Sequence, residues 1–304
     1  MRRVKMTSTG EDYVLMTAAR NEASYIEGTI KAVLSQTVKP RLWVIVSDGS
    51  TDKTDEIIRG YQKNAGFLTY LRREDPSWQV DFRRKVESLR LAQALFNGLS
   101  YNFIGNLDAD ITLPADYFEI LLHEFRRKPN LGIAGGVLYE PINGRFVRRY
   151  LSEESYVPGA VQFFRRECYE QVGGYVGLRW GGEDTVAVVS ARMKGWQTLS
   201  VQGLPAFHHK VSSGTGSALR GRFREAAMFY CLGSDPLFEI LKSLRWVGRR
   251  PYFFQGIARL CGYVWALCYY DKPDVSKEFV RYLRQEQRRR LRKAFKLSYR
   301  KKKR

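Results

Sequence analysis

A short apolar run in the middle of the chain stops abruptly at two carboxylates. Residues 102–107 read Asn-Phe-Ile-Gly-Asn-Leu and are followed by Asp108, Ala109 and Asp110. Alternate side chains of a strand project to the same face, so Asp108 and Asp110 can point together at the strand's end. At the carboxyl edge of a parallel sheet, where open α/β folds hold ligands, they would form a compact oxygen site. Such a site suits a hydrated divalent cation, although Asp-x-Asp alone is a weak signal because most such triplets are solvated turns.

Length and composition set the frame for this feature. The 304 residues are enough for one large domain or two ordinary ones, and 44% hydrophobic and 13% aromatic residues exclude general disorder. The net charge of +20 is unevenly spread, because residues 281–304 contain thirteen Lys or Arg and one acid, Glu286. The basicity is therefore mainly a property of the C-terminal tail.

Cysteine usage and the first residues bear on the cellular compartment. No Cys-x-x-Cys pair occurs, and the last three cysteines stand among apolar or aromatic residues, which predicts free buried thiols in a reducing compartment. The four are Cys168, Cys231, Cys261 and Cys268. Residues 1–3 lead into polar residues rather than an apolar signal segment, so a cytoplasmic protein is expected.

Strand and helix patterns alternate through the first 140 residues. Apolar runs predict strands over 13–18, 42–47, 67–71 and 131–139, and one that ends at Asp108. Helical spacing predicts helices from Ile26 to Leu34, after Thr54, over 80–96, and one with Pro114 in its first turn. Such alternation predicts a mainly parallel, twisted α/β sheet flanked by helices, with right-handed crossovers.

From Gln162 the pattern changes. The expected elements are a strand over 161–164, a small helix, glycine turns at 173–174 and 181–182, a helix from Glu183 to Met193, and an extended segment over 197–210. Beyond Ser213 the chain is helical, aromatic and increasingly basic. A doubly wound sheet brings strand ends together, so one cleft could collect the acids that end successive units.

Four segments, in order, resemble the motifs of family 2 glycosyltransferases of the GT-A fold. They are TAARNE at 17–22, SDGSTDKT at 47–54, LDAD at 107–110 and GGED at 181–184. The resemblance covers residues 13–210 and implies the α/β GT-A (nucleotide-diphospho-sugar transferase) fold. It implies a catalytic domain over 1–212, which leaves residues 213–304 as a helical, basic C-terminal region.

The resemblance also implies roles for donor-binding residues. Asp48 matches the position that hydrogen-bonds the nucleotide base, and Ala18 and Glu22 match the edge of the base and ribose pocket. Asp108 would face the ribose or the metal, and Asp110 would bind Mg²⁺ or Mn²⁺ directly. A helix cap or Asx turn is the alternative for Asp48, although Asp52 or Thr54 is better placed to cap the following helix.

Asp184 matches the catalytic base of the family. Inverting transfer needs a carboxylate that removes the proton of the acceptor hydroxyl as its oxygen attacks the anomeric carbon. The cation offsets charge on the leaving nucleoside diphosphate, so no enzyme-linked intermediate is needed. The alternative is that Glu183 and Asp184 only favour a helix N-terminus through the macrodipole.

Further contacts are expected from the late strand and beyond. Related transferases often place a histidine there, and because neighbours on a strand face opposite ways, only one of His208 and His209 is expected to reach the cleft. His208 is the preferred metal ligand, and an exposed surface pair is the alternative. Lys210 is expected at the donor diphosphate, while Glu183, His209 and Arg222 are candidate acceptor or diphosphate contacts, although solvated charges are common.

One departure from the family pattern concerns polymerisation. Processive members carry a Gln-x-x-Arg-Trp motif after the base, followed by membrane spans. The nearest approach here, residues 242–246, reads Lys-Ser-Leu-Arg-Trp and lacks the glutamine. Addition of a single sugar is therefore expected rather than synthesis of a long chain.

The C-terminal region has the features of a membrane-surface segment. Residues 252–270 are aromatic-rich, fall just short of the roughly 20 apolar residues a spanning helix needs, and contain Arg259. One helical stripe holds Phe253, Ile257, Leu260, Val264 and Leu267. We expect an in-plane helix, with the basic tail attracted to anionic lipid. A packed helix pair with a loose basic end is the alternative.

Together these features predict an inverting, metal-dependent transferase peripherally attached to the inner face of the cytoplasmic membrane. It would move one sugar from a nucleotide donor, expected to be UDP-linked, to a lipid-linked or polysaccharide acceptor. Transfer to polyisoprenyl phosphate and a catalytically inactive nucleotide-sugar sensor are alternatives. A nucleic-acid-binding protein is suggested by the pI near 9.9, but the charge is concentrated in one tail, so no nucleic-acid partner is expected.

Overall fold

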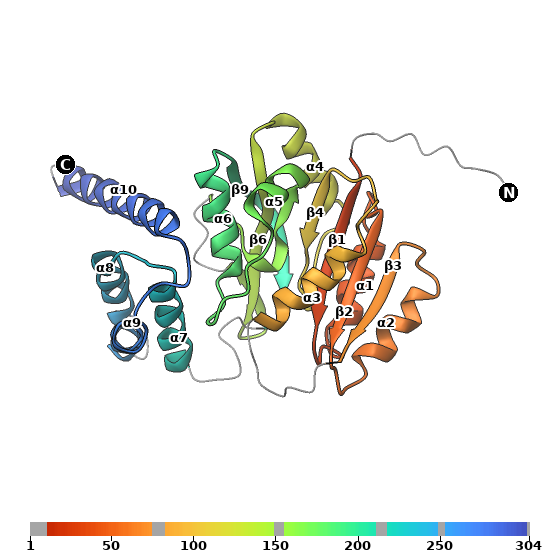
Figure 1. The fold of residues 1–304 in the computed structure, drawn as a ribbon, viewed down its shortest axis with the longest axis horizontal. Coiled ribbons are helices and arrows are strands. Elements are labelled where there is room, and N and C mark those ends of the chain that lie inside the picture. Colours follow the sequence, from red (N-terminus) through yellow and green to blue (C-terminus); the bar gives the residue numbers. More distant parts are fainter. Residues whose placement is uncertain (1–10, 75–82, 149–154, 211–217, 249–252, 303–304) are drawn as a thin grey trace. The chain divides into compact units, whose positions relative to one another are not determined.

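The computed structural model describes residues 11–74, 83–148, 155–210, 218–248 and 253–302 (Figure 1). The chain forms two compact units, and each is described by itself. The sheet unit comprises residues 1–177 and 183–211, and the helical unit comprises residues 178–182 and 212–304.

The sheet unit is built on one sheet, whose described strands have the order β3-β2-β1-β4-β8-β6-β9-β5, with β7 paired to β6. The strands are β1 (Tyr13–Ala19), β2 (Leu42–Asp48), β3 (Leu68–Arg73), β4 (Phe103–Asn106), β5 (Ile111–Thr112), β6 (Leu131–Ile142), β7 (Arg145–Arg148), β8 (Phe163–Arg165) and β9 (Gln197–His208). Strands β1 to β4 pair in parallel, as do β6 and β9, whereas β8 runs antiparallel to β4 and β6, and β5 to β9.

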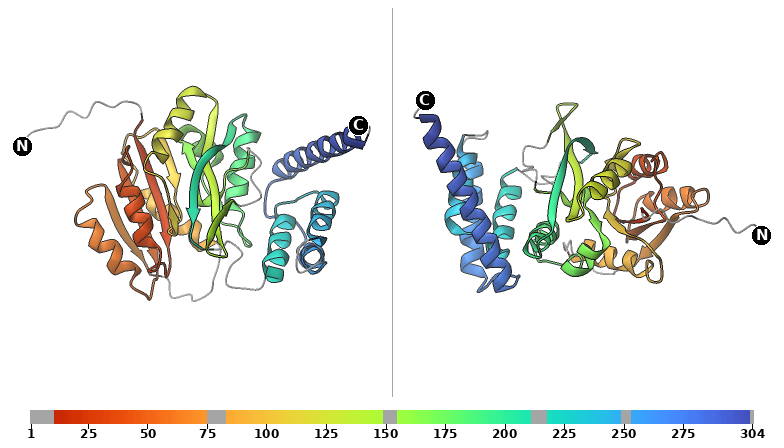
Figure 2. Two further views of the ribbon diagram at one scale, coloured as in Figure 1. Left: turned by 180° about the vertical axis from the view of Figure 1, so that it is seen from behind. Right: turned by 90° about the horizontal axis from the view of Figure 1, so that it is seen from above.

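Helices cover both faces of this sheet (Figure 2). They are α1 (Ile26–Leu34), α2 (Thr54–Gln62), α3 (Arg83–Ala94), α4 (Tyr117–Arg127), α5 (Arg166–Val172) and α6 (Glu183–Met193), with a 3₁₀ turn at Gly159–Val161. In β1, Tyr13 and Leu15 pack into one core with α1, α2 and α4, whereas Val14 and Met16 pack into the other with α3, α5 and α6. Burial on both faces explains why the strands read as continuous apolar runs.

The predicted parallel α/β sheet is therefore present, with differences at element ends. Pro114 lies in the turn before α4 rather than inside the helix, because the amide of Tyr117 bonds the Pro114 carbonyl at 3.2 Å. The third strand runs from 68 to 73 rather than from 67 to 71. Residues 80–82 of the predicted helix over 80–96 lie outside the described residues.

The helical unit contains α7 (Ala218–Cys231), α8 (Pro236–Val247), α9 (Phe254–Tyr269) and α10 (Lys277–Lys302). Helices α7 and α9 approach so closely that a Cβ at Gly262 would lie 2.2 Å from the carbonyl oxygen of Phe223. Among the described residues, no helix is both long and apolar enough to cross a membrane. The prediction of four buried thiols is wrong for Cys261 and Cys268, which are exposed because α9 turns apolar side chains outward.

Candidate active site

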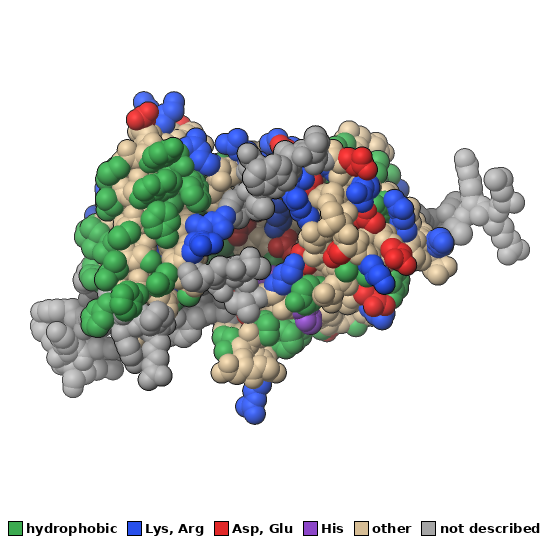
Figure 3. All heavy atoms as spheres, turned by 90° about the horizontal axis from the view of Figure 1, so that it is seen from below, with side chains coloured by type: hydrophobic (Ala, Val, Ile, Leu, Met, Phe, Trp, Pro, Cys, Tyr) green, Lys and Arg blue, Asp and Glu red, His purple; other side chains and the backbone are tan. Residues whose placement is uncertain are grey.

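Acidic side chains gather where the parallel strands of the sheet unit end. Asp48 is the last residue of β2, and Asp108 follows β4 by two residues. Asp110 directly precedes β5, which pairs with β9 so that Ile111 lies opposite His208. Figure 3 views the end of the molecule toward which the parallel strands run, and Asp and Glu side chains lie among Lys and Arg on this face of the sheet unit.

The side chains of Asp110 and His208 lie next to each other. The Nε2 atom of His208 lies 3.1 Å from Oδ2 of Asp110, and its Nδ1 atom lies 3.6 Å from Oε1 of Glu140, in β6. Both residues of the closer pair are largely buried. Burial alone would lower the pKa of His208, but hydrogen bonds to Asp110 and Glu140 raise it to about 9. The cluster therefore concentrates negative charge around one imidazole.

Asp108 forms an ion pair with a lysine of α3. The Lys85 ammonium lies 2.7 Å from Oδ1 of Asp108 and 3.9 Å from Oε1 of Glu183. The Asn106 amide donates to Oδ1 of Asp108 at 3.1 Å. Burial alone would raise the pKa of Asp108, but Lys85 and the Asn106 hydrogen bond hold it below its usual range. Burial raises the pKa of Glu183, and Lys85 only partly offsets this.

Asp184 stands in the first turn of α6 with its carboxylate held by donors from another segment. Its Oδ2 atom accepts from the Tyr156 hydroxyl at 2.9 Å and from the Gly159 amide at 3.1 Å. Its Oδ1 atom accepts from the amide of Thr185 at 2.7 Å. A Cβ at Gly159 would lie 2.8 Å from the Cβ of Asp184, so the close approach depends on glycine. The carboxylate is thus fixed in orientation by contacts on both oxygens.

Glu22 and Lys210 join the loop after β1 to the end of β9. The ammonium of Lys210 pairs with Oε1 of Glu22 and also lies 5.4 Å from the centre of the Tyr25 ring. Oε2 of Glu22 is buried and has no hydrogen-bond partner among the described residues. Burial raises the pKa of Glu22 above its usual range, although Lys210 opposes the shift. This oxygen is closed off from solvent as well as unpaired among the described residues.

Asp48 is held by two arginines that the sequence did not point to. Arg84, in α3, binds it with two hydrogen bonds, from Nε to Oδ2 at 2.8 Å and from Nη2 to Oδ1 at 2.9 Å. Nη1 of Arg73, the last residue of β3, donates to Oδ1 at 2.8 Å. Such planar two-point pairing fixes a carboxylate more firmly than a lysine would. Each carboxylate oxygen accepts more than one hydrogen bond, so Asp48 can also accept from a base.

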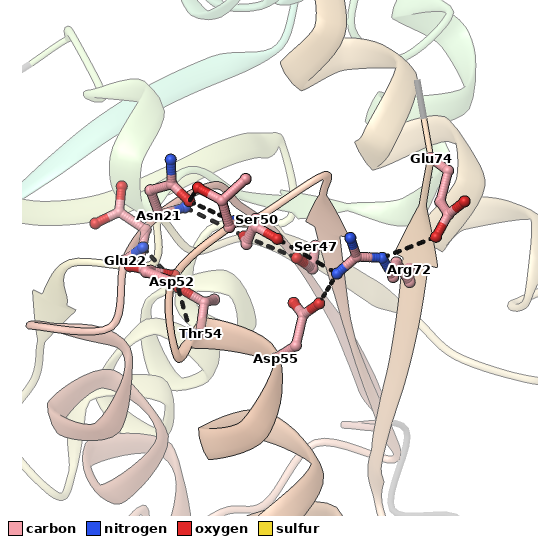
Figure 4. A network of polar contacts seen from close by, with 10 residues as sticks. Asn21, Glu22, Ser47, Ser50, Asp52, Thr54, Asp55, Arg72 and Glu74 are labelled. Atoms are coloured by element: carbon pink, nitrogen blue, oxygen red, sulfur yellow. Dashed lines mark hydrogen bonds and ion pairs between the residues drawn. The ribbon is translucent and has the colours of Figure 1, made fainter. Parts of the chain in front are cut away.

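The loops after β1 and β2 are tied together beside Asp48 (Figure 4). The Asn21 side chain accepts from the amide of Thr51 at 2.8 Å, and the amide of Glu22 donates to the Thr54 hydroxyl at 2.8 Å. Asp52 accepts from the amides of Ala23 and Thr54, both at 3.0 Å. The N-cap position of α2 is Lys53, which makes no side-chain cap hydrogen bond, so the cap predicted at Asp52 or Thr54 is not found at that position. These bonds fix the segment that carries Ala18, at the end of β1, and Glu22.

Two predicted contact residues are bound elsewhere. His209 pairs with the Thr112 hydroxyl at 2.9 Å, as expected from the opposite directions of neighbouring strand residues. Arg222 belongs to the helical unit, where it pairs with Glu225 at 2.8 Å and stacks on the Trp246 ring at 3.5 Å. The roles predicted for His209 and Arg222 stay predictions.

Sequence reasoning missed the residues that hold the predicted acids in place. They are Arg73, Arg84, Lys85, Glu140 and Tyr156. One feature of the sequence could have pointed to Arg84 and Lys85. Both stand in a helix whose charged residues precede the apolar positions 86 and 89. A solvated helix face has the same pattern. Glu140 is an acid near the end of a long apolar strand, and Tyr156 had no local signal.

Comparison with known proteins identifies the class. The fold resembles that of mannosyltransferase PcManGT from Pyrobaculum calidifontis, solved with GDP-Man and Mn²⁺, with a TM-score of 0.53, 18% identity and coverage of 86% of this chain and 73% of that chain. It also resembles S. aureus TarS, solved with UDP, with a TM-score of 0.51, 15% identity and coverage of 72% and 65%. The protein has the GT-A fold, which confirms the predicted fold class.

Sequence relatives give the family. The model of Glycosyl transferase family 2 matches residues 15–179, more than half of the chain, which therefore belongs to this family of glycosyltransferases. Poly-beta-1,6-N-acetyl-D-glucosamine synthases of Staphylococcus epidermidis and of Staphylococcus aureus strain COL are 30% identical over 129 residues, or 41% of this chain. These residues match only 28% of the length of those relatives.

Proposed function

We propose that the protein transfers a single sugar, with inversion, from a nucleotide-diphosphate donor to an acceptor hydroxyl. The donor is proposed to be UDP-linked and the acceptor lipid-linked or a polysaccharide, at the cytoplasmic face of a membrane. The observation that carries the proposal is the approach of His208 to Asp110, 3.1 Å apart, with Asp108 near enough to interact electrostatically with His208. The Mn²⁺ and nucleotides in the two structural neighbours add support.

The residues present fit a divalent cation. Mg²⁺ is commonly bound by one or two carboxylates together with substrate phosphates, and imidazole is a suitable ligand for many divalent metals. Asp110 offers one such oxygen, and His208, once a metal displaces its proton, offers one such nitrogen, close enough for one ion to be bound by both. Within the described residues, no group of three or more acids, histidines or cysteines forms a complete metal cage. A bound Mg²⁺ or Mn²⁺ would offset charge on the diphosphate.

The other residues supply binding and proton transfer. Asp48, oriented by Arg84 and Arg73, would accept a hydrogen bond from the imide N–H of uracil. Glu22 would lie at the edge of the base and ribose pocket. Ala18, at the end of β1, would line the same pocket, and Lys210 would pair with the donor diphosphate.

Asp184 would act as the base. It would take the proton of the acceptor hydroxyl while that oxygen bonds to the anomeric carbon and the bond from this carbon to the diphosphate breaks. Tyr156 and Gly159 hold Oδ2 of the carboxylate in one orientation. A fixed orientation of this kind lowers the entropy cost of reaching the transition state.

The test combines donor turnover with metal binding. A panel of UDP- and GDP-sugars with Mn²⁺ is expected to reveal turnover of one donor, and the anomeric configuration of the product can be read by NMR. Asp110→Ala is expected to abolish turnover and weaken Mn²⁺ binding in the presence of UDP, whereas Asp184→Asn is expected to abolish turnover only. Full activity in either variant would contradict the role assigned to that residue.

The same experiment separates two acceptor classes. A polyisoprenyl phosphate is already an anion and needs no base, so Asp184→Asn would then keep its activity toward such an acceptor. Loss of activity toward hydroxyl acceptors only would support the proposed base.

A further inference from the structure

Helices α8 and α9 of the helical unit expose apolar side chains to an unusual degree. In α8, Leu237, Ile240 and Leu244 are 57%, 46% and 55% exposed. In α9 and the residue before it, Phe253, Phe254, Ile257, Val264 and Leu267 are between 52% and 62% exposed. We call these eight residues the apolar face. Figure 3 shows hydrophobic side chains gathered over the helical unit.

The buried sides of the same helices are polar. Arg259 of α9 and Glu239 of α8 are 0% and 1% exposed. Gln255 of α9 and Ser243 of α8 are also buried. Both helices thus turn polar residues inward and apolar residues outward, which is the reverse of a helix that lies on a water-soluble core.

The buried charges are compensated by pairing. Nη1 of Arg259 lies 2.8 Å from Oε1 of Glu225, in α7, and Nη2 of Arg259 pairs with Glu239. Nζ of Lys242 lies 3.3 Å from the same Glu225 oxygen. These pairs connect α7, α8 and α9 by charge, in addition to the aromatic contacts between α7 and α9. Burial of ion pairs carries a desolvation cost that good geometry only partly returns.

This arrangement is unfavourable in water and favourable against hydrocarbon. Each of these side chains is about half exposed and so forgoes roughly half of the about 1.5–3 kcal/mol that full burial would give. In an apolar medium, the same side chains are removed from water. The charged groups, which pair on the inner side of the helices, stay out of that medium.

Charge and aromatic residues indicate what covers the apolar face. The described part of α10, in the same unit, exposes Arg281, Arg288, Arg289, Arg292 and Lys293. Trp265 and Tyr269, at the C-terminal end of α9, are 36% and 68% exposed, and Trp and Tyr favour the boundary between headgroups and acyl chains. An apolar surface in the same unit as exposed cations and interfacial aromatics complements an anionic bilayer.

We propose that the apolar face of α8 and α9 inserts into the headgroup and acyl boundary of an anionic bilayer. The polar cluster around Arg259 holds the inserted helices together from behind. Helix α9 has 16 residues, about 24 Å at 1.5 Å per residue, so it lies in the interface. This insertion rests on the membrane attachment in the proposed function. It adds that α8 and α9 insert into the bilayer, whereas α10 supplies only the attraction of its cations to anionic lipid.

The test measures binding of the full chain to vesicles of phosphatidylcholine with 30% phosphatidylglycerol. The variant I257E/L267E places two carboxylates on the apolar face, and the matched control L91E/L95E makes the same change at exposed leucines of the sheet unit. We expect at least tenfold weaker vesicle binding for I257E/L267E and unchanged binding for the control. Blue-shifted Trp fluorescence on vesicle addition, absent in Trp265→Phe, is the expected sign of insertion.

Several outcomes would overturn the inference. The first is vesicle binding by I257E/L267E that equals that of the parent. The second is a parent protein that does not bind vesicles but forms concentration-dependent dimers, which I257E/L267E abolishes. Donor hydrolysis in detergent-free buffer provides an independent readout. A protein that binds vesicles through this face but turns over no nucleotide sugar would keep the insertion and reject the proposed transfer. The reverse result would reject the insertion alone.

Discussion

The Lys85 ammonium lies 2.7 Å from Oδ1 of Asp108 and 3.9 Å from Oε1 of Glu183, so one cation of α3 connects the end of β4 to the start of α6. The Lys85 and Asp108 side chains are only 30% and 25% exposed. Without this cation, neighbouring carboxylates would repel one another in a poorly solvated place. Lys85 is thus a positioning residue for the acids that the proposed reaction uses.

Lys85→Met is expected to lower kcat/KM for the donor about tenfold or more, because the acids lose the cation that positions them. A tenfold fall corresponds to a loss of about 1.4 kcal/mol in transition-state stabilisation. Lys85→Arg keeps the charge and is expected to recover part of the activity. Lys128→Met removes a comparable 2.7 Å pair with Glu124 on the surface of α4 and serves as the control. Equal activity of Lys85→Met and Lys128→Met would contradict the positioning role.

The acids of the site could be predicted because their signals are local. Asp48 and Asp108 each follow an apolar run that ends at a sheet edge, and Asp184 begins a helix after two glycines. Lys85 could not be predicted, because its approach to Asp108 depends on how α3 crosses the sheet. Nothing in the sequence near Glu140 indicates that β9 brings His208 beside it.

The polarity of α9 illustrates the same limit. Helical spacing places Phe253, Ile257, Leu260, Val264 and Leu267 on one stripe, and the structure finds all of them exposed except Leu260, which is half-buried. The spacing alone could not tell whether that stripe faces a core or a membrane. The direction is set by Arg259, whose partners come from two other helices of the unit.

Arg84→Lys is expected to raise the KM for the donor several-fold with a smaller change in kcat. Arg84 is buried, and a lysine cannot reproduce its two hydrogen bonds to Asp48. Asp48 would then lose its orientation toward the base while the reacting atoms are unaffected. The control is Arg126→Lys, which changes a surface pair with Glu11. A fall in kcat alone would contradict the assignment of Asp48 to base binding.

The helical unit is expected to lose stability in acid. Burial alone would raise the pKa of Glu225, but Lys242, Arg259 and Arg222 lower it to about 2. The pKa of Glu225 in the folded protein is thus below its value near 4.5 in the unfolded chain. The ionised carboxylate therefore makes its full contribution to stability at pH values above about 4.5. Its contribution is lost as the pH falls from about 4.5 towards 2.

Thermal denaturation of the parent and of Glu225→Gln between pH 6 and 2 tests this expectation. The variant is expected to be less stable at pH 6, because it leaves buried cations with less compensation, and to show a flatter dependence on pH. Glu170→Gln, at an exposed position of α5, is expected to follow the parent. Identical pH slopes for the parent and Glu225→Gln would contradict the assignment.

The last prediction concerns the contact between Gly159 and Asp184. A Cβ at position 159 would lie 2.8 Å from the Cβ and 3.1 Å from Oδ2 of Asp184, so Gly159→Ala must displace one of the two segments. The proposed base would then lose the Gly159 amide and its alignment with the acceptor, and misplacement by about 1 Å can cost on the order of a hundredfold in rate. We therefore expect a large fall in kcat, accompanied by a rise in the KM for the donor, because the Asn106 amide that donates to Asp108 also donates to the Gly159 carbonyl. Gly66→Ala, where an added Cβ meets nothing within 4 Å, is the matched control. If Gly159→Ala were as active as Gly66→Ala while still folded, the position of Asp184 would not limit the reaction, and the carboxylate would be no more than part of the start of α6.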